Sequence, residues 1–456
     1  MLAVSDLAVV LACGALAYGL RLWTGGMLTP ADYLELAPAA LLFVAGLSVA
    51  GLYPGYGLGP VEELRRYAYV TSLVFLALVT ATFLMKAGHL YSRGILLTAW
   101  ALTTVALPAT RALLRSLLSR TEWWGEPVVI LGAGQTGHLV VRRLRANPGL
   151  GWRPVAVLDD DPSKWNTSMN GIPVLGGLEL CTSLAAAGRI SRAVLAIPGA
   201  SWQRLADIVD RQARRFLRVS VVPDLFHLPS MWVSARDLQG ILLLDIRSNL
   251  LDRRMRAVKR LAELLLALAV SVVALPVMAL IVVAVKLDSP GPVLFGHERV
   301  GQGGRRFRAL KFRTMVPNAD SVLRESLARD AALRDEWARE HKLKNDPRIT
   351  RVGRFLRRFS LDELPQLWNV LRGDMSLVGP RPIVADEAAK YGPAFDLYSR
   401  VRPGLTGLWQ VSGRNDTSYE ERVELDSYYI RNWSVWLDVY ILMRTVTAVL
   451  SGKGAY

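Results

Sequence analysis

Cysteine is scarce in this chain of 456 residues, and acidic side chains are fewer than basic ones. The two cysteines, Cys13 and Cys181, lie far apart, and the first is part of an apolar run. This excludes a disulfide framework and a cysteine-based zinc site, and it predicts a reducing compartment. Asp and Glu total 39 against 55 Lys and Arg, a net charge of +16. Such an excess suits three classes of anionic partner: lipid headgroups, phosphorylated substrates and nucleic acid.

Hydrophobic residues make up 52% of the chain and the mean hydropathy is +0.26, yet 21% of the residues are charged. A purely soluble protein would be less apolar, and a bundle buried entirely in lipid would carry fewer charges. We therefore expect a protein with both membrane and cytosolic parts. At roughly 150 residues per domain, the length predicts about three units.

Four apolar stretches fill the first part of the chain, each near the ~20 residues that cross a ~30 Å hydrocarbon layer as a helix. They cover residues 4–23, 34–53, 67–86 and 95–118. The first has no basic segment before it and no cleavage site after it, so we expect a retained anchor. Arginines follow the second and fourth stretches, whereas the charged residues between the first two are acidic. By the positive-inside rule, both ends of this transmembrane bundle face the cytoplasm.

Short β-rich runs alternate with helical segments between about residues 125 and 245, which is the rhythm of a doubly wound α/β sheet. Gly132, Gly134 and Gly137 follow a strand and open a helix, and Asp159 lies 22 residues beyond Gly137. This is the dinucleotide fingerprint in its expected setting. Two interpretations stand: the loop binds a nucleotide, or, as we favour, the glycines only allow a tight turn and close helix packing. The segment has no Tyr-x-x-x-Lys pair, which argues against a short-chain dehydrogenase or dehydratase site.

A fifth apolar run, residues 261–285, is long enough to cross the membrane as a helix of ~37 Å. The segments on both sides of it are strongly basic, so a full crossing would place one of them outside. Pro276 lies in the middle of the run, where it removes a backbone hydrogen bond and kinks the helix. We therefore predict a re-entrant helix that bends and returns to the same face. A spanning helix is the alternative.

These patterns divide the chain into three expected domains. They are a four-helix transmembrane domain (1–120), a Rossmann-like α/β domain (121–248), and a mainly α-helical monotopic catalytic domain with a re-entrant membrane helix (249–456). Within the third, residues 318–344 are charged on nearly every face and predict a solvated helical hairpin without chemistry.

The densest group of polar motifs begins with two adjacent carboxylates, Asp362 and Glu363. On their own, such a pair beside arginines indicates a surface salt-bridge cluster. Pro365 changes this interpretation because proline suits the first turn of a helix. We therefore expect the carboxylates at or near a helix N-terminus, where free N–H groups and the helix dipole favour anions.

Cations from two motifs accompany these carboxylates. Gly-Pro-Arg-Pro is a rigid turn expected to hold Arg381 outward, and a guanidinium group binds phosphate bidentately. Lys311 and Arg313 come from Lys-Phe-Arg-Thr-Met. Together these residues predict a polyphosphate pocket that contains two carboxylates. Mg²⁺ shared with a diphosphate is the natural partner of those carboxylates.

The motifs of residues 250–456 resemble those of the bacterial sugar transferases, the polyprenyl-phosphate hexose-1-phosphate transferases. The resemblance rests on Leu287-Asp-Ser-Pro-Gly-Pro-Val-Leu-Phe295, Glu298-Arg-Val-Gly301, Lys311-Phe-Arg-Thr-Met315, Ser360-Leu-Asp-Glu-Leu-Pro-Gln366, Leu377-Val-Gly-Pro-Arg-Pro382 and Arg402-Pro-Gly-Leu-Thr-Gly-Leu-Trp-Gln-Val-Ser-Gly-Arg-Asn415. Four spans and a Rossmann-like domain before this region are similar to the large, multidomain members. Gly296-His297, the segment 343–350 and the ending 454–456 look most like the galactose branch.

The resemblance implies transfer of a hexose 1-phosphate, galactose 1-phosphate in that branch, from a UDP-sugar to undecaprenyl phosphate. UMP is released, and the product starts O-antigen or exopolysaccharide synthesis. In the implied mechanism Asp362 attacks the phosphorus that bears the sugar, and undecaprenyl phosphate then attacks the aspartyl-phosphosugar. Glu363 would hold Mg²⁺, while Arg357, Lys311 and Arg381 would bind phosphate oxygens. Direct transfer in one step, with Asp362 as a base, is the competing mechanism.

Three further residues gain candidate roles from the same resemblance. Asp438 matches a functionally important acidic position of the large members, without an assigned role. Arg414 and Asn415 either bind the nucleotide or sugar or order their loop, and both interpretations stay open.

Three rival functions come from other features. A nucleotide-sugar dehydratase or epimerase would use the glycine-rich loop. A binding or scaffold protein would sense a nucleotide and be inactive at Asp362. Nucleic-acid binding fits the net charge, but membrane spans and the lack of a base-reading module argue against it. We expect a multi-pass protein of the bacterial inner membrane with its catalytic domain on the cytoplasmic face, and a homodimer formed through the middle domain.

Overall fold

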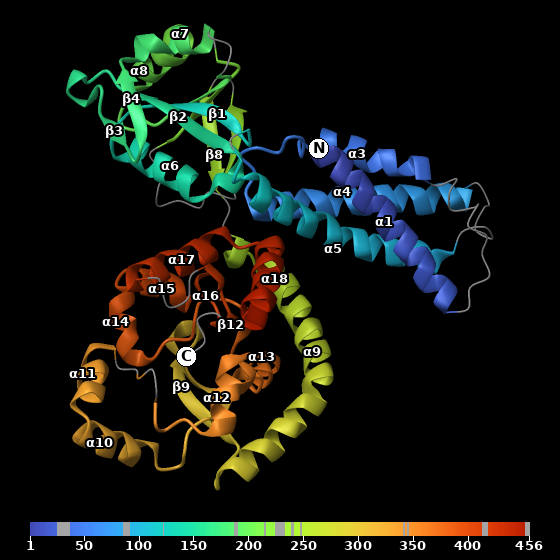
Figure 1. The fold of residues 1–456 in the computed structure, drawn as a ribbon, viewed down its shortest axis with the longest axis vertical. Coiled ribbons are helices and arrows are strands. Elements are labelled where there is room, and N and C mark those ends of the chain that lie inside the picture. The colour runs from blue at the N-terminus through green and yellow to red at the C-terminus, as the bar shows by residue number, and fades with distance from the viewer. Residues whose placement is uncertain are drawn as a thin grey trace. The chain divides into compact units, whose positions relative to one another are not determined.

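The computed structural model describes the chain except for residues 25–36, 85–91, 122, 187–189, 214–215, 224–232, 239–240, 247–248, 341–342, 344–345, 413–417 and 452–456. The described residues form two compact units, Met1–Phe226 and His227–Tyr456 (Figure 1). The first unit holds an apolar helical bundle and an α/β sheet. The second holds a long apolar helix and a largely helical body. The division into three domains at 120 and 248 stays a prediction.

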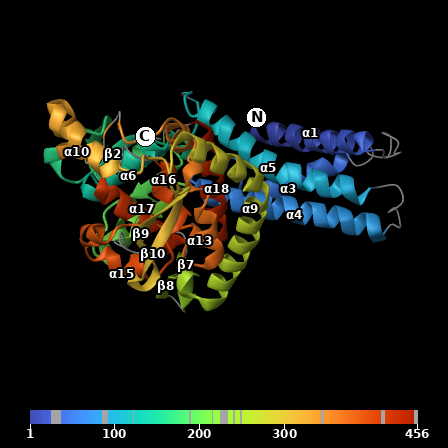
Figure 2. The same ribbon diagram turned by 90° about the horizontal axis from the view of Figure 1, so that it is seen from below.

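The bundle of the first unit consists of α1 (Leu2–Trp23), α3 (Ala40–Val49), α4 (Pro60–Leu84) and α5 (Arg93–Leu118), which lie together in both ribbon views (Figures 1 and 2). Among the described helices of this bundle, α1, α4 and α5 are long and apolar enough to cross a membrane. In the second expected span, the apolar helix covers Ala37–Val49 within the described residues. It ends where Gly51 adopts a left-handed φ of 71°. Thirteen residues of helix reach ~20 Å, less than a hydrocarbon layer.

Buried charges join three helices of this bundle. The guanidinium group of Arg111 on α5 is fully buried and donates from Nε to Glu63 Oε1 on α4 at 3.1 Å. On α1, the carboxylate of Asp6 accepts a hydrogen bond from the Tyr67 hydroxyl at 2.9 Å. Arg111 Nη1 lies 4.0 Å from Asp6 Oδ2. Because an unpaired charge inside an apolar bundle costs several kcal/mol, this network fixes how the three helices pack.

The α/β part contains one six-stranded sheet with the order β3-β4-β2-β1-β5-β6. All neighbours are parallel except β3 and β4. The strands are β1 (Glu126–Leu131), β2 (Trp152–Leu158), β3 (Ser168–Met169), β4 (Ile172–Gly176), β5 (Arg192–Leu195) and β6 (Arg218–Val221), and the helices are α6 (Gln135–Ala146), α7 (Cys181–Ala186) and α8 (Trp202–Asp207). Alternate residues of β1 enter two separate hydrophobic cores, so both faces of the sheet are covered. The predicted Rossmann-like sheet is confirmed.

The second unit begins with a hairpin and continues into a mainly helical body. Its strands are β7 (Val233–Leu238) and β8 (Ile241–Ile246), β9 (Leu294–Val300) and β10 (Arg306–Phe312), and β11 (Ser376–Val378) and β12 (Gly404–Thr406). Its helices are α9 (Arg253–Asp288), α10 (Ala319–Arg329), α11 (Ala331–Glu340), α12 (Arg351–Arg358), α13 (Gln366–Arg372), α14 (Ala388–Tyr391), α15 (Ala394–Ser399), α16 (Leu408–Ser412), α17 (Tyr419–Asn432) and α18 (Val435–Ser451). The exposed pair α10 and α11 forms where the charged hairpin is predicted.

The helix α9 is one continuous element of 36 residues with Pro276 inside it. It is curved and runs along one side of the body of its unit (Figures 1 and 2). Near its beginning, Arg260 donates to the carbonyl oxygen of Val370 at 2.7 Å. Near its end, Ile281 and Val285 belong to a core formed with the body of the same unit. Both ends of α9 are therefore attached to one body.

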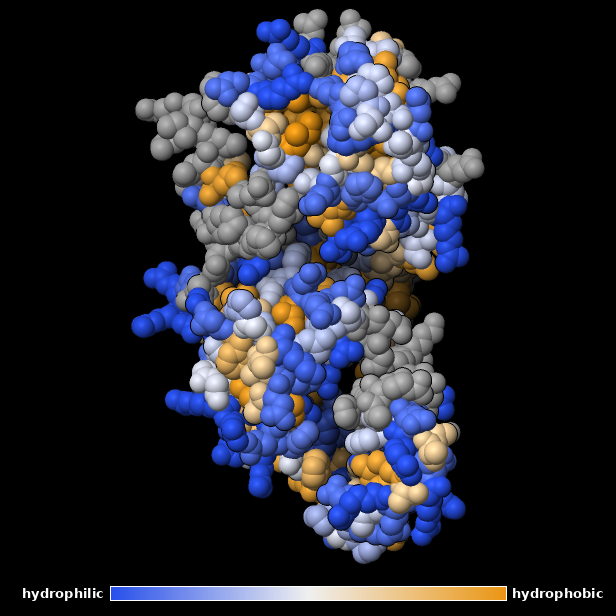
Figure 3. Space-filling view, turned by 90° about the vertical axis from the view of Figure 1, so that its left-hand side faces the viewer, coloured by the Kyte–Doolittle hydropathy of each residue, from blue (hydrophilic) through white to orange (hydrophobic). Residues whose placement is uncertain are grey.

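Apolar side chains between these ends point away from the body. Val273 is 77% exposed and Leu280 is 71% exposed. By contrast, the face drawn in Figure 3 is mostly hydrophilic, with hydrophobic residues in small separate groups. A long helix with exposed apolar side chains on successive turns is typical of contact with lipid.

We predict that Arg111→Met destabilises the first unit. The variant removes the buried cation that lies between Asp6 and Glu63, and Glu63 keeps only its ion pair with Arg115 at 3.1 Å. Removing one partner of a buried ion pair costs roughly 3–5 kcal/mol, and the midpoint of thermal unfolding in lipid nanodiscs should fall accordingly. The matched control is Arg65→Met, because Arg65 pairs with Glu62 at a half-exposed position and such pairs contribute about 0–1 kcal/mol. Equal losses in the two variants would contradict the account.

Candidate active site

Asp362 and Glu363 lie in a short 3₁₀ turn, Leu361–Glu363, between α12 and α13. α12 is fixed at its start by Thr350, whose hydroxyl accepts a hydrogen bond from the N–H of Gly353 at 3.0 Å. After α12, Ser360 takes a left-handed φ of 54° and turns the chain into the 3₁₀ turn. The carboxylates were predicted at or near the N-terminus of a helix. They lie near the start of α13, in the turn that precedes this helix and not in its first turn.

The structure brings Lys311 to this pair from the hairpin strand β10. Lys311 Nζ lies 2.6 Å from Glu363 Oε1 and 3.8 Å from Asp362 Oδ2. The three charged groups therefore form one cluster, although 51 residues separate Lys311 from Asp362 in sequence. Behind the turn, Leu361 and Leu364 pack against a core that contains Phe312, the next residue of β10. This packing holds the strand and the turn together.

The two carboxylates have different surroundings. Asp362 is only 7% exposed, whereas the side chain of Glu363 is 32% exposed. Burial raises the pKa of Asp362 above its usual value, and the charges of Lys311 and Arg357 oppose this rise. Asp362 is thus a nearly buried carboxyl group with cations beside it, and Glu363 is its accessible neighbour.

The arginines predicted for the pocket have distinct contacts. Arg357, in the last turn of α12, donates from Nε to Thr314 Oγ1 at 2.9 Å and lies close enough to Asp362 to interact with its charge. Arg313 is buried, and its guanidinium group donates to the carbonyl oxygens of Ser289 and Pro290 at 2.6 and 2.9 Å. Arg313 therefore holds the segment that leaves α9.

A second cationic group lies on the hairpin face that carries Lys311. In the antiparallel register, Lys311 pairs with Phe295, and His297 and Arg299 follow on the same side of β9. Arg299 Nη2 lies 2.9 Å from His297 Nδ1. Burial and the charge of Arg381 lower the pKa of Arg299, and the charge of Glu363 acts in the opposite direction. Arg299 and Arg381 thus extend the cationic region beyond the acidic pair.

Arg381 is held by contacts on both sides of its segment. Its guanidinium group lies over the ring of Trp409, 5.4 Å from the centroid. The hydroxyl of Tyr398 lies 3.1 Å from the Arg381 carbonyl oxygen and 3.0 Å from that of Val300, at the end of β9. The sequence pattern did not identify Arg299 or Trp409 as site residues. Alternation along β9, combined with the hairpin register, was the signal for Arg299.

Asp438 lies in a separate buried network. Its carboxylate accepts hydrogen bonds from Lys259 Nζ at 2.7 Å, from the Tyr429 hydroxyl at 2.8 Å and from the Trp433 indole at 3.0 Å. Lys259, on α9, also donates to the carbonyl oxygen of Val378 at 3.1 Å. Val378 is three residues before Arg381, so Asp438 links the long apolar helix to the segment that carries Arg381. This contact set indicates a positioning role.

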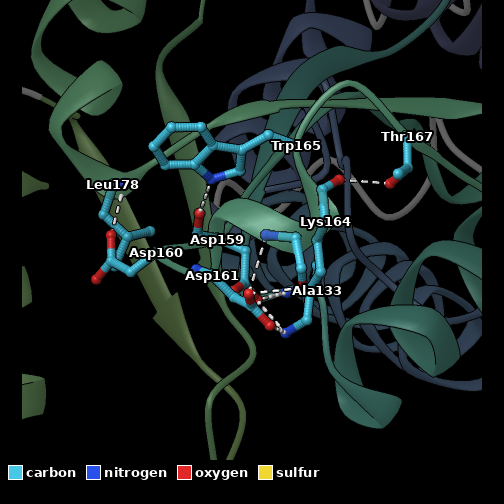
Figure 4. Close-up of polar contacts among 9 residues, drawn as sticks. Ala133, Asp159, Asp160, Asp161, Lys164, Trp165, Thr167 and Leu178 are labelled. Atoms are coloured by element: carbon cyan, nitrogen blue, oxygen red, sulfur yellow. Dashed lines mark hydrogen bonds and ion pairs between the residues drawn. The ribbon is translucent and has the colours of Figure 1, made fainter.

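The glycine-rich loop of the Rossmann-like sheet forms a second candidate site (Figure 4). Asp159, at the end of β2, accepts a hydrogen bond from the N–H of Ala133 at 2.6 Å, and Lys164 Nζ lies 3.2 Å from its carboxylate. A Cβ atom on Gly137 would meet the carbonyl oxygen of Gly132 at 2.0 Å. Packing alone therefore requires glycine at 137.

The loop also borders a cavity. Its volume is about 470 Å³, and Gly134 and Asp159 belong to its lining. Nucleotide binding there stays a prediction. Arg414 and Asn415 lie outside the described residues, so their predicted roles have no structural counterpart here.

The donor set of the acidic pair fits the predicted magnesium ion. In the part of the chain that the structure describes, no group of three or more His, Cys, Asp or Glu side chains is arranged to hold a metal. Magnesium usually takes one or two carboxylates together with phosphate oxygens of the substrate and water. Glu363 is partly exposed and lies beside Asp362, so these two carboxylates fit an ion that binds together with a diphosphate.

Comparison with known proteins gives two family matches. Residues 254–452 match the bacterial sugar transferase family, and residues 49–223 match a family described as a CoA-binding domain. The chain is 40% identical to the UDP-galactose-lipid carrier transferase of Erwinia amylovora, over 80% of this chain and 76% of that protein. It is 39% identical to the undecaprenyl-phosphate galactose phosphotransferase of Salmonella typhimurium, over 87% of this chain and 82% of that protein.

A third relative covers the whole chain. The UDP-glucose:undecaprenyl-phosphate glucose-1-phosphate transferase of Xanthomonas campestris pv. campestris is 32% identical over 100% of this chain and 94% of its own length. The similarity is therefore not confined to the C-terminal motifs and includes the helical bundle and the α/β sheet.

We predict that Gly137→Ala destabilises the α/β sheet whatever the loop binds. The added methyl group meets the Gly132 carbonyl oxygen, and relieving such a contact costs roughly 1–3 kcal/mol. Gly149→Ala is the control, because nothing lies within 4 Å of the added atom. The measurement is the thermal midpoint of each variant without added nucleotide. An unchanged midpoint in Gly137→Ala would refute the packing interpretation.

Proposed function

The chain belongs to the bacterial sugar transferase family, and we propose the mechanism by which it works as an undecaprenyl-phosphate sugar-1-phosphate transferase. The donor is a UDP-hexose, the acceptor is undecaprenyl phosphate, and UMP is released. The observation that carries the proposal is the cluster of buried Asp362, partly exposed Glu363 and Lys311. It combines a shielded carboxyl nucleophile with positive charge, which phosphoryl transfer requires.

We propose galactose as the hexose. The relatives from Erwinia amylovora and Salmonella typhimurium have names that specify galactose, at 40% and 39% identity. The relative from Xanthomonas campestris, whose name specifies glucose, is 32% identical. The order of these identities supports galactose over glucose.

The proposed reaction has two balanced steps. First, an Oδ atom of Asp362 attacks the phosphorus that bears the sugar; the bond from this phosphorus to the UMP oxygen breaks, and UMP leaves with the electron pair. Second, a phosphate oxygen of undecaprenyl phosphate attacks the same phosphorus. The bond to Asp362 then breaks, and the free carboxylate is restored. The product is undecaprenyl diphosphate linked to the sugar.

The cations of the pocket would serve these steps by binding phosphate. Lys311 lies beside both carboxylates, and Arg357 and Arg381 supply guanidinium groups that can bind phosphate oxygens bidentately. Magnesium held by Glu363 would neutralise negative charge on the diphosphate when bound. Near-burial of Asp362 keeps water away from the proposed aspartyl-phosphosugar.

We propose that α9 is re-entrant. Straight, 36 residues of helix would reach ~54 Å, and a crossing would separate the two ends by the thickness of the bilayer. Arg260 and Val285, near opposite ends of the apolar part, both contact the body of the same unit. This attachment supports an entry and a return on one face. It would place the site at the level of lipid headgroups, where a soluble UDP-sugar and a lipid-anchored phosphate meet.

The setting follows from this proposal. The catalytic body would face the cytoplasm at the bacterial inner membrane, and the product would start O-antigen or exopolysaccharide assembly. We also propose a homodimer formed through the α/β sheet domain.

The covalent step predicts a labelled protein. After rapid quenching of the full chain with UDP-galactose labelled in the sugar, without lipid acceptor, we expect label on the wild type and none on Asp362→Asn. Asp386→Asn, at an exposed position in the same unit, should label like the wild type. Absence of label on the wild type, while turnover with lipid is intact, would favour the one-step mechanism.

The pH dependence of kcat/KM tests the role of Lys311. Asp362 must be ionised to attack, so kcat/KM should fall as the pH drops through its pKa, which burial has raised. Lysine at 311 lowers this pKa; Lys311→Met should therefore move the acid limb to higher pH. Lys311→Arg keeps the charge and should leave the limb near its original position. A limb that stays in place or moves to lower pH in Lys311→Met would contradict the assignment.

A further inference from the structure

A cavity beside the first turns of α9 has several cationic side chains in its lining. Its volume is about 330 Å³. The cationic side chains in its lining are Arg253, Arg256, Lys259, Arg260, Arg400 and Arg402, and the one carboxylate in the lining is Glu263. Neither carboxylate of the acidic pair belongs to this lining, and nor does Lys311. The cavity is therefore distinct from the proposed reaction centre.

Several of these cations already have partners. Lys259 pairs with Glu263 and Asp438, each at 2.7 Å, and Arg400 pairs with Asp396 at 2.5 Å. Arg260 donates to backbone carbonyl oxygens of α13. These groups contribute to the positive potential but are held by the protein.

Three arginines of the lining are not paired. Within the described residues, the side chains of Arg253, Arg256 and Arg402 make no hydrogen bond or ion pair, although the backbone N–H of Arg256 donates to the carbonyl oxygen of Asp252. Arg402 is half-buried and lies close enough to Arg260 for their charges to repel each other. Like charges held together in a cavity favour an anionic ligand, and guanidinium groups match phosphate.

The position of the cavity along α9 indicates where the anion comes from. Arg260 is followed directly by Leu261, which is 61% exposed, and one turn later Leu265 is 63% exposed. The cavity therefore lies at the point where α9 changes from basic to apolar. On a membrane helix this boundary lies at the headgroup level.

We propose that this cavity binds the phosphate headgroup of an anionic phospholipid. The acceptor is a less suitable occupant, because its phosphate must reach the phosphorus at Asp362, and that carboxylate is absent from the lining. A soluble phosphate is also less suitable, because the cavity adjoins the exposed apolar part of α9, where lipid is concentrated. The proposal rests on the proposed membrane position of α9 and does not depend on the chemistry at Asp362.

A bound headgroup would touch the link between the membrane helix and the active site. Lys259 and Val378 both line the cavity, and they are joined by the hydrogen bond that leads toward Arg381. The site thus offers a physical route by which anionic lipid promotes the ordering of Arg381.

Native mass spectrometry of the full chain in detergent tests the proposal without any substrate. Phosphatidylglycerol is titrated against phosphatidylcholine, and we expect one preferentially bound phosphatidylglycerol on the wild type. Arg256→Gln and Arg402→Gln should each weaken this binding about tenfold, the value of one charged hydrogen bond. Arg254→Gln is the matched control, because Arg254 is exposed on the same turn of α9 but does not line the cavity.

Four outcomes would overturn the proposal. Equal losses in Arg254→Gln and Arg256→Gln would indicate diffuse attraction to charge rather than a site, and equal binding of the two lipids would remove the headgroup preference. Displacement of phosphatidylglycerol by millimolar inorganic phosphate or UMP would assign the cavity to a soluble ligand. Displacement by equimolar undecaprenyl phosphate would assign it to the acceptor. Because Arg256 is exposed, its replacement should not disturb folding. Lipid binding is measured without substrate, so the result can be interpreted even if turnover is lost or the proposed transferase function is wrong.

Discussion

The burial of the Asp362 carboxyl group beside Lys311 is the interaction on which the rest of the C-terminal unit depends. Removing a carboxylate from water costs free energy unless cations and hydrogen bonds replace the solvent. Lys311 on β10 and Arg357 on α12 supply positive charge from two different elements. The core around Phe312 holds the strand and the turn together, and the left-handed Ser360 turns the chain from α12 into the segment that carries the pair. The same arrangement leaves Glu363 accessible, so one carboxylate is shielded while its neighbour can meet a phosphate-bound metal ion.

The long apolar helix connects this chemistry to the membrane through polar contacts at one end and apolar packing at the other. At the first end, Lys259 joins Asp438 and the carbonyl oxygen of Val378, just before the segment that carries Arg381. At the other end, Val285 shares the core that supports the acidic turn. A movement of α9 would thus displace both the segment that carries Arg381 and the turn that carries the acidic pair. This gives a physical reason for making the membrane anchor and the catalytic body one unit.

Features set by local sequence were predictable, and features set by distant contacts were not. Hydrophobic length located α1, α4 and α5, strand and helix alternation located the sheet, and charge located the α10–α11 hairpin. Length did not show where the second apolar helix ends, because the apolar run includes the turn at Gly51. In the site, motif density identified the acidic pair and Lys311. The sequence alone could not show that Arg313 contacts Ser289, or that Arg299 lies on the same face as Lys311. Both arrangements depend on how strands β9 and β10 pair. Asp438 finds its partner 179 residues away on α9, which no local pattern reveals.

The most direct test of the central claim is exchange of labelled UMP into UDP-galactose by the full chain in the absence of undecaprenyl phosphate. If Asp362 forms a bond to the sugar-bearing phosphorus, UMP can attack that intermediate in reverse. Label should then enter UDP-galactose without lipid, and Asp362→Asn should abolish the exchange. Exchange that appears only when the lipid acceptor is present would show that both substrates react in one step, and it would contradict the account.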